Sequence, residues 1–364
     1  MNPRWQVAPT FWPRRLARSA VRFVLVSVLL PSCAPRQIIV ERAPQAYYQT
    51  AFPLLDASRQ LERIHESVKR VHFTAEYQTF VFTKEAGVTS ADNLLSPAVL
   101  ALAVDTLIEV QSKSGTASIL ARARRGMALL TNQHVVHYPA VRIQYFDERP
   151  ARVRSRSTPR HVASVAIRTQ DRGTLPDHPN LGRFEVLVRD SVNDLALLEV
   201  RFREDSDTAA FDAMPVAPGD PERLSWGSFV YVIGYPRGYP MVTFGIISDP
   251  NRDRTGSFLT NGLWNEGISG GAILAVRGDT GRLEWVGIAR AGAGAAEIRL
   301  QPLAGETADE LDLPLVYEGP LFVESVLRIQ YGITFSVPMT LIRSFVSDNG
   351  RLLAARGYDP RGWY

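Results

Sequence analysis

The chain has 364 residues, of which 45% are hydrophobic and 21% are charged. This composition excludes a disordered or fibrous protein, and the length suffices for one large hydrophobic core or two smaller ones. The formal net charge is +4, but residues 1–32 contain five arginines and no acidic residue, so the chain without them carries −1. A general affinity for nucleic acid is therefore not expected.

Residues 1–33 have the pattern of an export signal. An arginine-rich start precedes the apolar run 23–30, which is shorter than the ~20 residues that a membrane span needs. Cys33 is the single cysteine of the chain, so no disulfide can form within it. Residues 30–33 resemble the signal of bacterial lipoproteins, which predicts a lipid anchor at Cys33 on the periplasmic face of a bacterial membrane. The alternative is cleavage after Ala34, which gives a soluble periplasmic or secreted protein.

Residues 34–55 are rich in Pro, Ala, Gln and Tyr and are expected to form a tether. Apolar residues then recur at steps of three and four, which predicts an amphipathic helix over 56–75. These residues are Leu61, Ile64, Val68 and Val71. We expect the helix to pack on its own domain, and oligomerisation is the alternative.

The pattern then changes to short β-branched and aromatic runs separated by turn residues, which is typical of all-β proteins. Strands are expected over 104–111, 117–121, 127–130, 141–146, 184–188, 195–200, 229–233, 242–248, 271–276, 285–289 and 333–337. Because no helical pattern intervenes, we expect two packed barrels within a domain spanning 76–348. A short C-terminal helix is expected over 340–346, followed by a tail over 349–364.

Two insertions interrupt this domain, near 147–180 and 291–330. Between residues 149 and 172 there are seven arginines and one acidic residue. We interpret this segment as a solvent-exposed loop or hairpin, with a docking patch for an anionic partner or lipid headgroups as the alternative. The second insertion mixes Gly and Ala with acidic residues, and no role is assigned to it.

Residues 265–273 have the build of a loop that presents a nucleophilic serine, Ser269. Gly267, Gly270 and Gly271 leave the backbone free to turn tightly, so that N–H groups can converge beside the serine hydroxyl. A serine hydroxyl is a poor nucleophile at neutral pH, so a base and an orienting carboxylate are required as well.

The sequence offers both groups at strand ends. His134 follows an apolar strand, where a rigid scaffold can hold a general base facing a cleft. Asp194 directly precedes the apolar run 195–200, where its carboxylate can be buried against the imidazole. Other candidates, outside these patterns, are His137, His161 and Asp190.

Five segments in this order resemble the chymotrypsin-like serine peptidases, and most closely the HtrA/Deg-type trypsin-like proteases. They are residues 131–136, 193–198, 232–248, 265–271 and 331–338. The resemblance implies two six-stranded antiparallel β-barrels and a His134–Asp194–Ser269 triad that acts through an acyl-enzyme. It also implies an oxyanion hole formed by the N–H groups of Gly267 and Ser269.

The resemblance further places Leu263 at the floor of the primary substrate pocket, with walls near Ile288 and Arg290. Since no carboxylate lies there, we expect a preference for apolar or small aliphatic residues, and Arg290 favours an acidic residue as the alternative. Ile268 departs from the family pattern, which usually has Asp or Asn at this position. Activation by pairing of that residue with a newly released N-terminus is therefore excluded.

The expected function is a serine endopeptidase acting on extended or misfolded polypeptides in envelope protein quality control, without a PDZ domain. A homotrimer is suggested by family resemblance only. No cofactor or metal is expected, because no paired-His or Cys/His cluster has ligand spacing. The alternative is a catalytically inactive protease-fold lipoprotein that binds peptides or scaffolds envelope proteins. A carboxylesterase is disfavoured, because α/β-hydrolases place the serine before the acid and the histidine.

Overall fold

A computed structural model of the chain describes residues 46–53, 56–146, 159–202, 211–262, 264–302 and 321–359. Side chains are described throughout these ranges except over 291–331. The predicted signal peptide and Cys33 lie outside the described residues, and so does Leu263.

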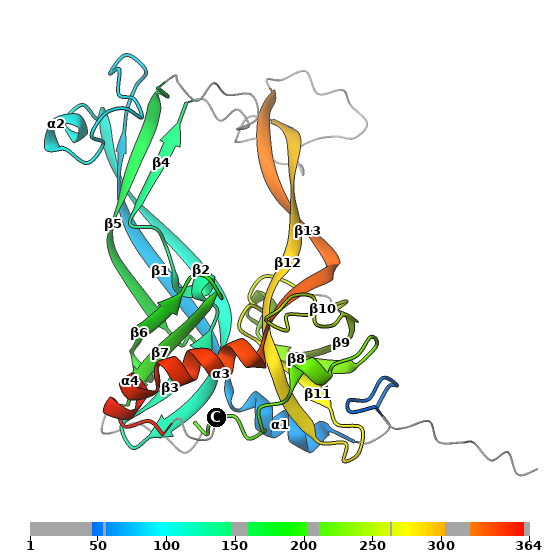
Figure 1. The fold of residues 1–364 in the computed structure, drawn as a ribbon. Helices are drawn as coiled ribbons and strands as arrows, with labels where there is room; N and C mark the ends of the chain where they lie inside the picture. The colour runs from blue at the N-terminus through cyan, green and yellow to red at the C-terminus, as the bar shows by residue number, and fades with distance from the viewer. Residues whose placement is uncertain are drawn as a thin grey trace, which may run out of the picture. The chain divides into compact units, whose positions relative to one another are not determined.

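The first half of the domain is an antiparallel sheet of seven strands (Figure 1). Its strands are β1 Val68–Val81, β2 Asp105–Ala123, β3 Gly126–Thr131, β4 Val141–Tyr145, β5 Val162–Thr174, β6 Arg183–Asp190 and β7 Leu195–Arg201. Their order is β1-β2-β3-β7-β6-β5-β4, and β1 also pairs with β5. Six strands therefore close into a ring, and β4 pairs with residues 162–167 of β5, which lie beyond the short pairing of β5 with β6.

The second half is a closed barrel of six antiparallel strands in the order β10-β13-β12-β11-β8-β9. Its strands are β8 Phe229–Gly234, β9 Met241–Asp249, β10 Leu259–Thr260, β11 Ala272–Val276, β12 Leu283–Pro302 and β13 Leu321–Pro338. The two-barrel, all-β fold predicted from the sequence is confirmed.

Four buried clusters lie among the described residues, and three of them fill the two barrels and the space between them. One fills the first barrel and includes Phe73, Tyr77 and Leu129, and another fills the second barrel around Val230 and Ile273. The third lies between them, because residues of β3 and β7 pack there against residues of β8, β11 and β12. The two barrels therefore share one hydrophobic seam.

The helices are α1 Ser58–His65, α2 Pro97–Leu100, α3 Met339–Asp348 and α4 Gly350–Ala355. The predicted C-terminal helix is confirmed as α3, whose Ile342, Phe345 and Val346 are buried in the seam between the barrels. Among the described residues, no helix is long and apolar enough to cross a membrane.

The predicted helix over 56–75 is wrong beyond His65. Ser67 is followed by an alternating pattern in which every second residue from Val71 to Tyr77 is buried, which is the period of a strand. This strand, β1, pairs with β2 on one side and β5 on the other. Pairing on both edges outweighs the helical spacing of the first few apolar residues.

Two segments expected to be loosely attached are packed against the domain. Tyr48, within the predicted tether, is 1% exposed, and its hydroxyl donates to Glu284 Oε2 at 2.8 Å and accepts from the Asp220 N–H at 2.9 Å. In the predicted tail, α4 is followed by buried Tyr358, whose hydroxyl donates to Glu199 Oε1 at 3.1 Å. Both tyrosines can be buried because their polar ends are paired.

The described parts of both insertions contain strands. β5 occupies 162–174 and pairs antiparallel with β4, so this part of the arginine-rich segment is one strand of a hairpin, buried at Val162 and Val165 and exposed at residues 169–172. Residues 147–158 lie outside the described residues. In the second insertion β12 and β13 continue as a long hairpin, paired as far as Pro302 with Leu321.

Candidate active site

His134 lies in a short 3₁₀ turn, Gln133–Val136, that follows β3. Two side chains fix this turn. The Asn132 side-chain amide donates to the Asp194 carbonyl at 2.9 Å, and Lys113 Nζ donates to the His134 carbonyl at 3.1 Å. The His134 side chain is 42% exposed. The backbone is thus anchored while the imidazole remains accessible.

Asp194 precedes β7 in a left-handed backbone conformation with a φ of 58°. Aspartate tolerates this region better than most residues. Its carboxylate, 9% exposed, binds His134 twice: Oδ1 accepts from the His134 N–H at 2.9 Å, and Oδ2 lies 2.8 Å from His134 Nδ1. This arrangement favours a proton on Nδ1 and leaves Nε2 as the nitrogen that can accept one.

Arg290 on β12 also contacts this carboxylate, because its Nε donates to Asp194 Oδ2 at 3.2 Å. Burial alone would raise the pKa of Asp194. The hydrogen bonds and charge of His134, with the Arg290 charge, outweigh burial and hold that pKa below its ordinary value. The carboxylate is therefore ionised at neutral pH.

Ser269 lies in the loop between β10 and β11. Its hydroxyl donates to the Arg290 carbonyl at 2.8 Å, and within the described part of the chain it makes no hydrogen bond with His134. The structure therefore brings His134 and Asp194 together and directs the serine hydroxyl to a backbone oxygen. A change of the Ser269 side-chain rotamer is needed before the imidazole can take its proton.

The turn around Ser269 requires glycine at two positions. Gly267 and Gly270 have φ values of 97° and 88°, a region that disfavours other residues. A Cβ on Gly267 would overlap the Tyr235 carbonyl, and one on Gly270 would overlap the Thr116 carbonyl. No described group accepts a hydrogen bond from the N–H of Gly267 or Ser269. Both N–H groups are therefore available as oxyanion donors.

Ile268, which departs from the family pattern, is 3% exposed and packs in the cluster that fills the second barrel. Its Cδ1 lies so close to Gly234 that a Cβ there would meet it. The loop is thus anchored by a buried apolar side chain, which requires no charged partner.

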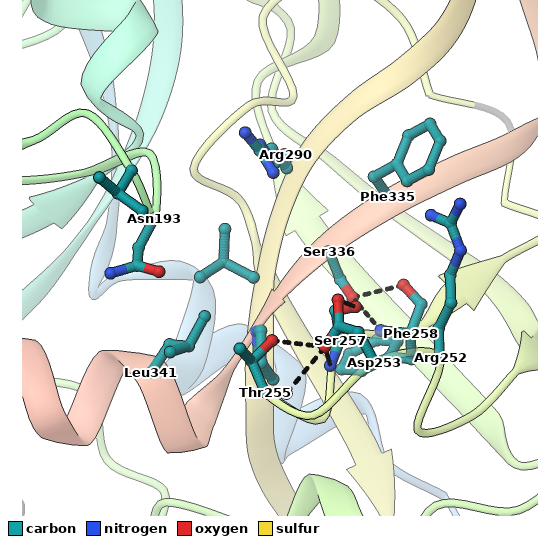
Figure 2. Close-up of a pocket in the computed structure, with 13 residues that line it drawn as sticks. Asn193, Arg252, Asp253, Thr255, Ser257, Phe258, Arg290, Phe335, Ser336 and Leu341 are labelled. Carbon is teal, nitrogen blue, oxygen red and sulfur yellow. Dashed lines mark hydrogen bonds between the residues drawn. The ribbon is translucent and has the colours of Figure 1, made fainter.

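The two described residues predicted for the primary pocket, Ile288 and Arg290, differ in their accessibility. Ile288 is fully buried in the seam between the barrels, so it offers no surface to a substrate. Arg290 lines a cavity of about 240 Å³ beside Asp194, together with Asn193, Leu341 and Arg252 (Figure 2). Of the two predicted pocket residues that the structure describes, Arg290 is the one that reaches this cavity next to the candidate triad.

The other sequence candidates have structural roles. Asp190 accepts hydrogen bonds from the N–H groups of Val192 and Asn193 and so shapes the turn before Asp194. His161 forms an isolated β-bridge with Thr89. Among the described residues, no group of three or more His, Cys, Asp or Glu side chains is arranged to hold a metal ion.

Residues 115–288, which include all three triad candidates, match the family model of the trypsin-like peptidase domain. Over this stretch, just under half of the chain, the sequence is similar to the trypsin-like peptidase domain. No curated protein matches this chain.

Solved structures similar to this chain include HtrA-type proteases. The HtrA-type protease AlgW with a tripeptide is 18% identical with a TM-score of 0.40, and the match covers 84% of this chain and 65% of that one. The active form of the Rv3671c protease from M. tuberculosis is 13% identical with a TM-score of 0.39, over 84% and 91% of the two chains. Deg5 is 17% identical with a TM-score of 0.34, over 66% and 88%. This chain thus spans less than two thirds of the AlgW chain.

Proposed function

We propose that this chain is a serine endopeptidase that hydrolyses peptide bonds of extended or misfolded polypeptides. The observation that carries the proposal is the double hydrogen bond between His134 and Asp194, on the first barrel. The second barrel contributes the serine loop, in which the N–H groups of Gly267 and Ser269 donate to no described acceptor. The family match over 115–288 supports the same class of reaction.

The proposed reaction begins when the Ser269 hydroxyl turns from the Arg290 carbonyl towards His134 Nε2. As Ser269 Oγ attacks the peptide carbonyl carbon, His134 takes the hydroxyl proton, and Asp194 stabilises the imidazolium. The N–H groups of Gly267 and Ser269 donate to the oxyanion. The C–N bond then breaks, His134 protonates the leaving amine, and an acyl-enzyme ester remains.

Water hydrolyses this ester by the reverse sequence. His134 takes a proton from the attacking water, the oxyanion forms again in the same place, and Ser269 recovers its proton as the acid product leaves. Each step uses only groups of this chain and water.

Export and membrane attachment form part of the proposal. The arginine-rich and apolar leader, followed by Cys33, supports a lipoprotein on the periplasmic face of a bacterial membrane that acts in envelope protein quality control. The intact mass of the mature protein tests this, because lipidation predicts an N-terminal Cys33 with added acyl mass. Cleavage after Ala34 without added mass would contradict it and support the soluble form. Sedimentation of the same material tests the trimer suggested by resemblance.

A second candidate function is a catalytically inactive protease-fold lipoprotein that binds peptides or scaffolds envelope proteins. Two hydrogen bonds favour it. The Ser269 hydroxyl donates to the Arg290 carbonyl, and the Arg290 guanidinium donates to the Asp194 carboxylate. For catalysis, the Ser269 hydroxyl would have to leave the Arg290 carbonyl, and the Asp194 carboxylate would have to lose Arg290 or bind it together with His134.

A fluorophosphonate probe separates the two functions, because it reacts with an activated serine hydroxyl. The endopeptidase proposal predicts stoichiometric labelling of the wild type at Ser269 and none of Ser269→Ala. Cleavage of an unfolded protein should be lost in the same variant. If the wild type is neither labelled nor active, even with unfolded polypeptide added, the scaffold function is favoured.

A further inference from the structure

Thr116 belongs to the first barrel and makes two hydrogen bonds with the serine loop of the second. It lies on β2 and is fully buried. Its N–H donates to the Ser269 carbonyl at 2.8 Å, and its Oγ1 donates to the Gly267 carbonyl at 2.8 Å. The two barrels touch so closely here that Gly270 has no room for a side chain against the Thr116 carbonyl.

These two hydrogen bonds lie on either side of an oxyanion donor. The N–H of Ser269 belongs to the peptide unit that joins Ile268 to Ser269. Thr116 holds the carbonyl of the preceding peptide unit, at Gly267, and the carbonyl of the following one, at Ser269. The peptide unit that carries the Ser269 N–H is therefore fixed at both ends by one residue.

The hydroxyl of Thr116 has its direction set by a second contact. Its oxygen accepts a hydrogen bond from the Tyr235 N–H at 2.9 Å, which leaves the hydroxyl proton for the Gly267 carbonyl. The other oxyanion donor is held independently, because the Arg237 N–H donates to the Glu266 carbonyl at 2.7 Å and so fixes the peptide unit of the Gly267 N–H.

We propose that Thr116 is a positioning residue for the oxyanion hole, whose Oγ1 keeps the Ser269 N–H aimed at the developing oxyanion. An oxyanion hole accelerates the reaction only if its donors are preorganised. A loop with glycine at 267, 270 and 271 has many alternative backbone conformations, so its geometry must be imposed by neighbours. This inference rests on the proposed endopeptidase function.

The test compares Thr116→Val, which keeps the side-chain shape without the hydroxyl, with Thr116→Ser, which keeps the hydroxyl. Direct loss of an oxyanion donor lowers kcat about 10²- to 10³-fold. Because loss of Oγ1 only misaligns a donor, we expect Thr116→Val to lower kcat about tenfold with KM changed less than threefold. Thr116→Ser should stay within threefold of the wild type. Affinity for a peptide boronate, which mimics the tetrahedral intermediate, should fall in parallel with kcat.

A matched control is available in the same barrel. Thr79 on β1 is 2% exposed, and its hydroxyl has no hydrogen-bond partner among the described residues. Thr79→Val removes a buried hydroxyl without touching the serine loop, so it should leave kcat unchanged. Thermal melting of each variant identifies any that fails to fold, and Thr116→Ala, which leaves room for a water molecule, replaces Thr116→Val in that case.

Hydrogen exchange of the peptide 265–271 gives a readout that does not depend on catalysis. Exchange should be faster in Thr116→Val than in the wild type and restored in Thr116→Ser. The role of Thr116 would be overturned if Thr116→Val had the kcat and the exchange rate of the wild type. It would also be overturned if the valine and serine variants lost kcat equally. A wild type that exchanges as expected but cleaves nothing refutes the endopeptidase function instead, and with it the oxyanion hole.

Discussion

Asp194→Asn isolates the charge of the buried carboxylate, since the side chain keeps its shape. Asp194 Oδ2 faces two donors, His134 Nδ1 and Arg290 Nε, while Oδ1 faces the His134 N–H. An asparagine has only one oxygen for these two positions. If that oxygen replaces Oδ2, the new NH₂ group faces a backbone donor. If it replaces Oδ1, the NH₂ group faces Arg290 and the imidazole.

In the second orientation His134 must accept at Nδ1, so its proton moves to Nε2 and it cannot act as the base. A serine-protease triad with this replacement loses about 10⁴ in kcat. We therefore expect kcat/KM for a short peptide to fall about 10³- to 10⁴-fold, or ~4–5.5 kcal/mol of transition-state stabilisation. In the first orientation a buried donor is unpaired, which costs about 1–3 kcal/mol of folding stability.

The assay is initial-rate hydrolysis of a peptide at pH 7, with thermal melting to confirm folding. Asp190→Asn is the matched control, because an asparagine can still accept from the Val192 and Asn193 N–H groups and should retain activity within about threefold. A folded Asp194→Asn variant within tenfold of the wild type would show that Asp194 does not orient the base.

Three further outcomes are expected. Tyr48→Phe should lower the free energy of unfolding by about 1–3 kcal/mol, because it leaves buried polar partners unpaired, whereas Tyr47→Phe, at a 38% exposed residue, should cost less; equal melting temperatures would contradict this. Burial alone would raise the pKa of Asp253, but hydrogen bonds from the hydroxyls and N–H groups of residues 255 and 257 lower it to about 2. The contribution of Asp253 to stability is therefore present above pH ~4 and lost as the pH falls towards 2. The melting difference between wild type and Asp253→Ala should shrink over that range, and a constant difference would refute the assignment. A peptide panel should show cleavage after apolar or small residues, or after acidic residues if Arg290 contacts the side chain, and a clear preference for Lys or Arg would contradict both.

The elements around the candidate triad could be predicted because their signals are local. His134 and Asp194 flank strands β3 and β7, whose residues are nearly all buried, and such apolar runs are recognisable without a partner. The glycines around Ser269 are likewise a local requirement, set by backbone conformations that other residues disfavour. The predicted two-barrel fold follows from the same strand pattern.

Strand β1 could not be predicted in this way. Leu61, Ile64, Val68 and Val71 satisfy a helical period, and local spacing does not reveal that residues beyond 67 will pair with both β2 and β5. The burial of Tyr48 and Tyr358 was missed for the same reason, since their partners lie more than 150 residues away.

By itself the sequence determined that the domain is built mainly of strands, which loop turns tightly, and which side chains can carry acyl-transfer chemistry. Each of these properties depends on a few adjacent residues. Only the tertiary structure decided that Thr116 holds the serine loop, that Arg290 contacts both Asp194 and Ser269, and that the serine hydroxyl faces a backbone carbonyl. The physical reason is that a hydrogen bond needs its donor and acceptor about 3 Å apart. Residues far apart in the sequence come this close only because the two barrels pack along their shared apolar seam.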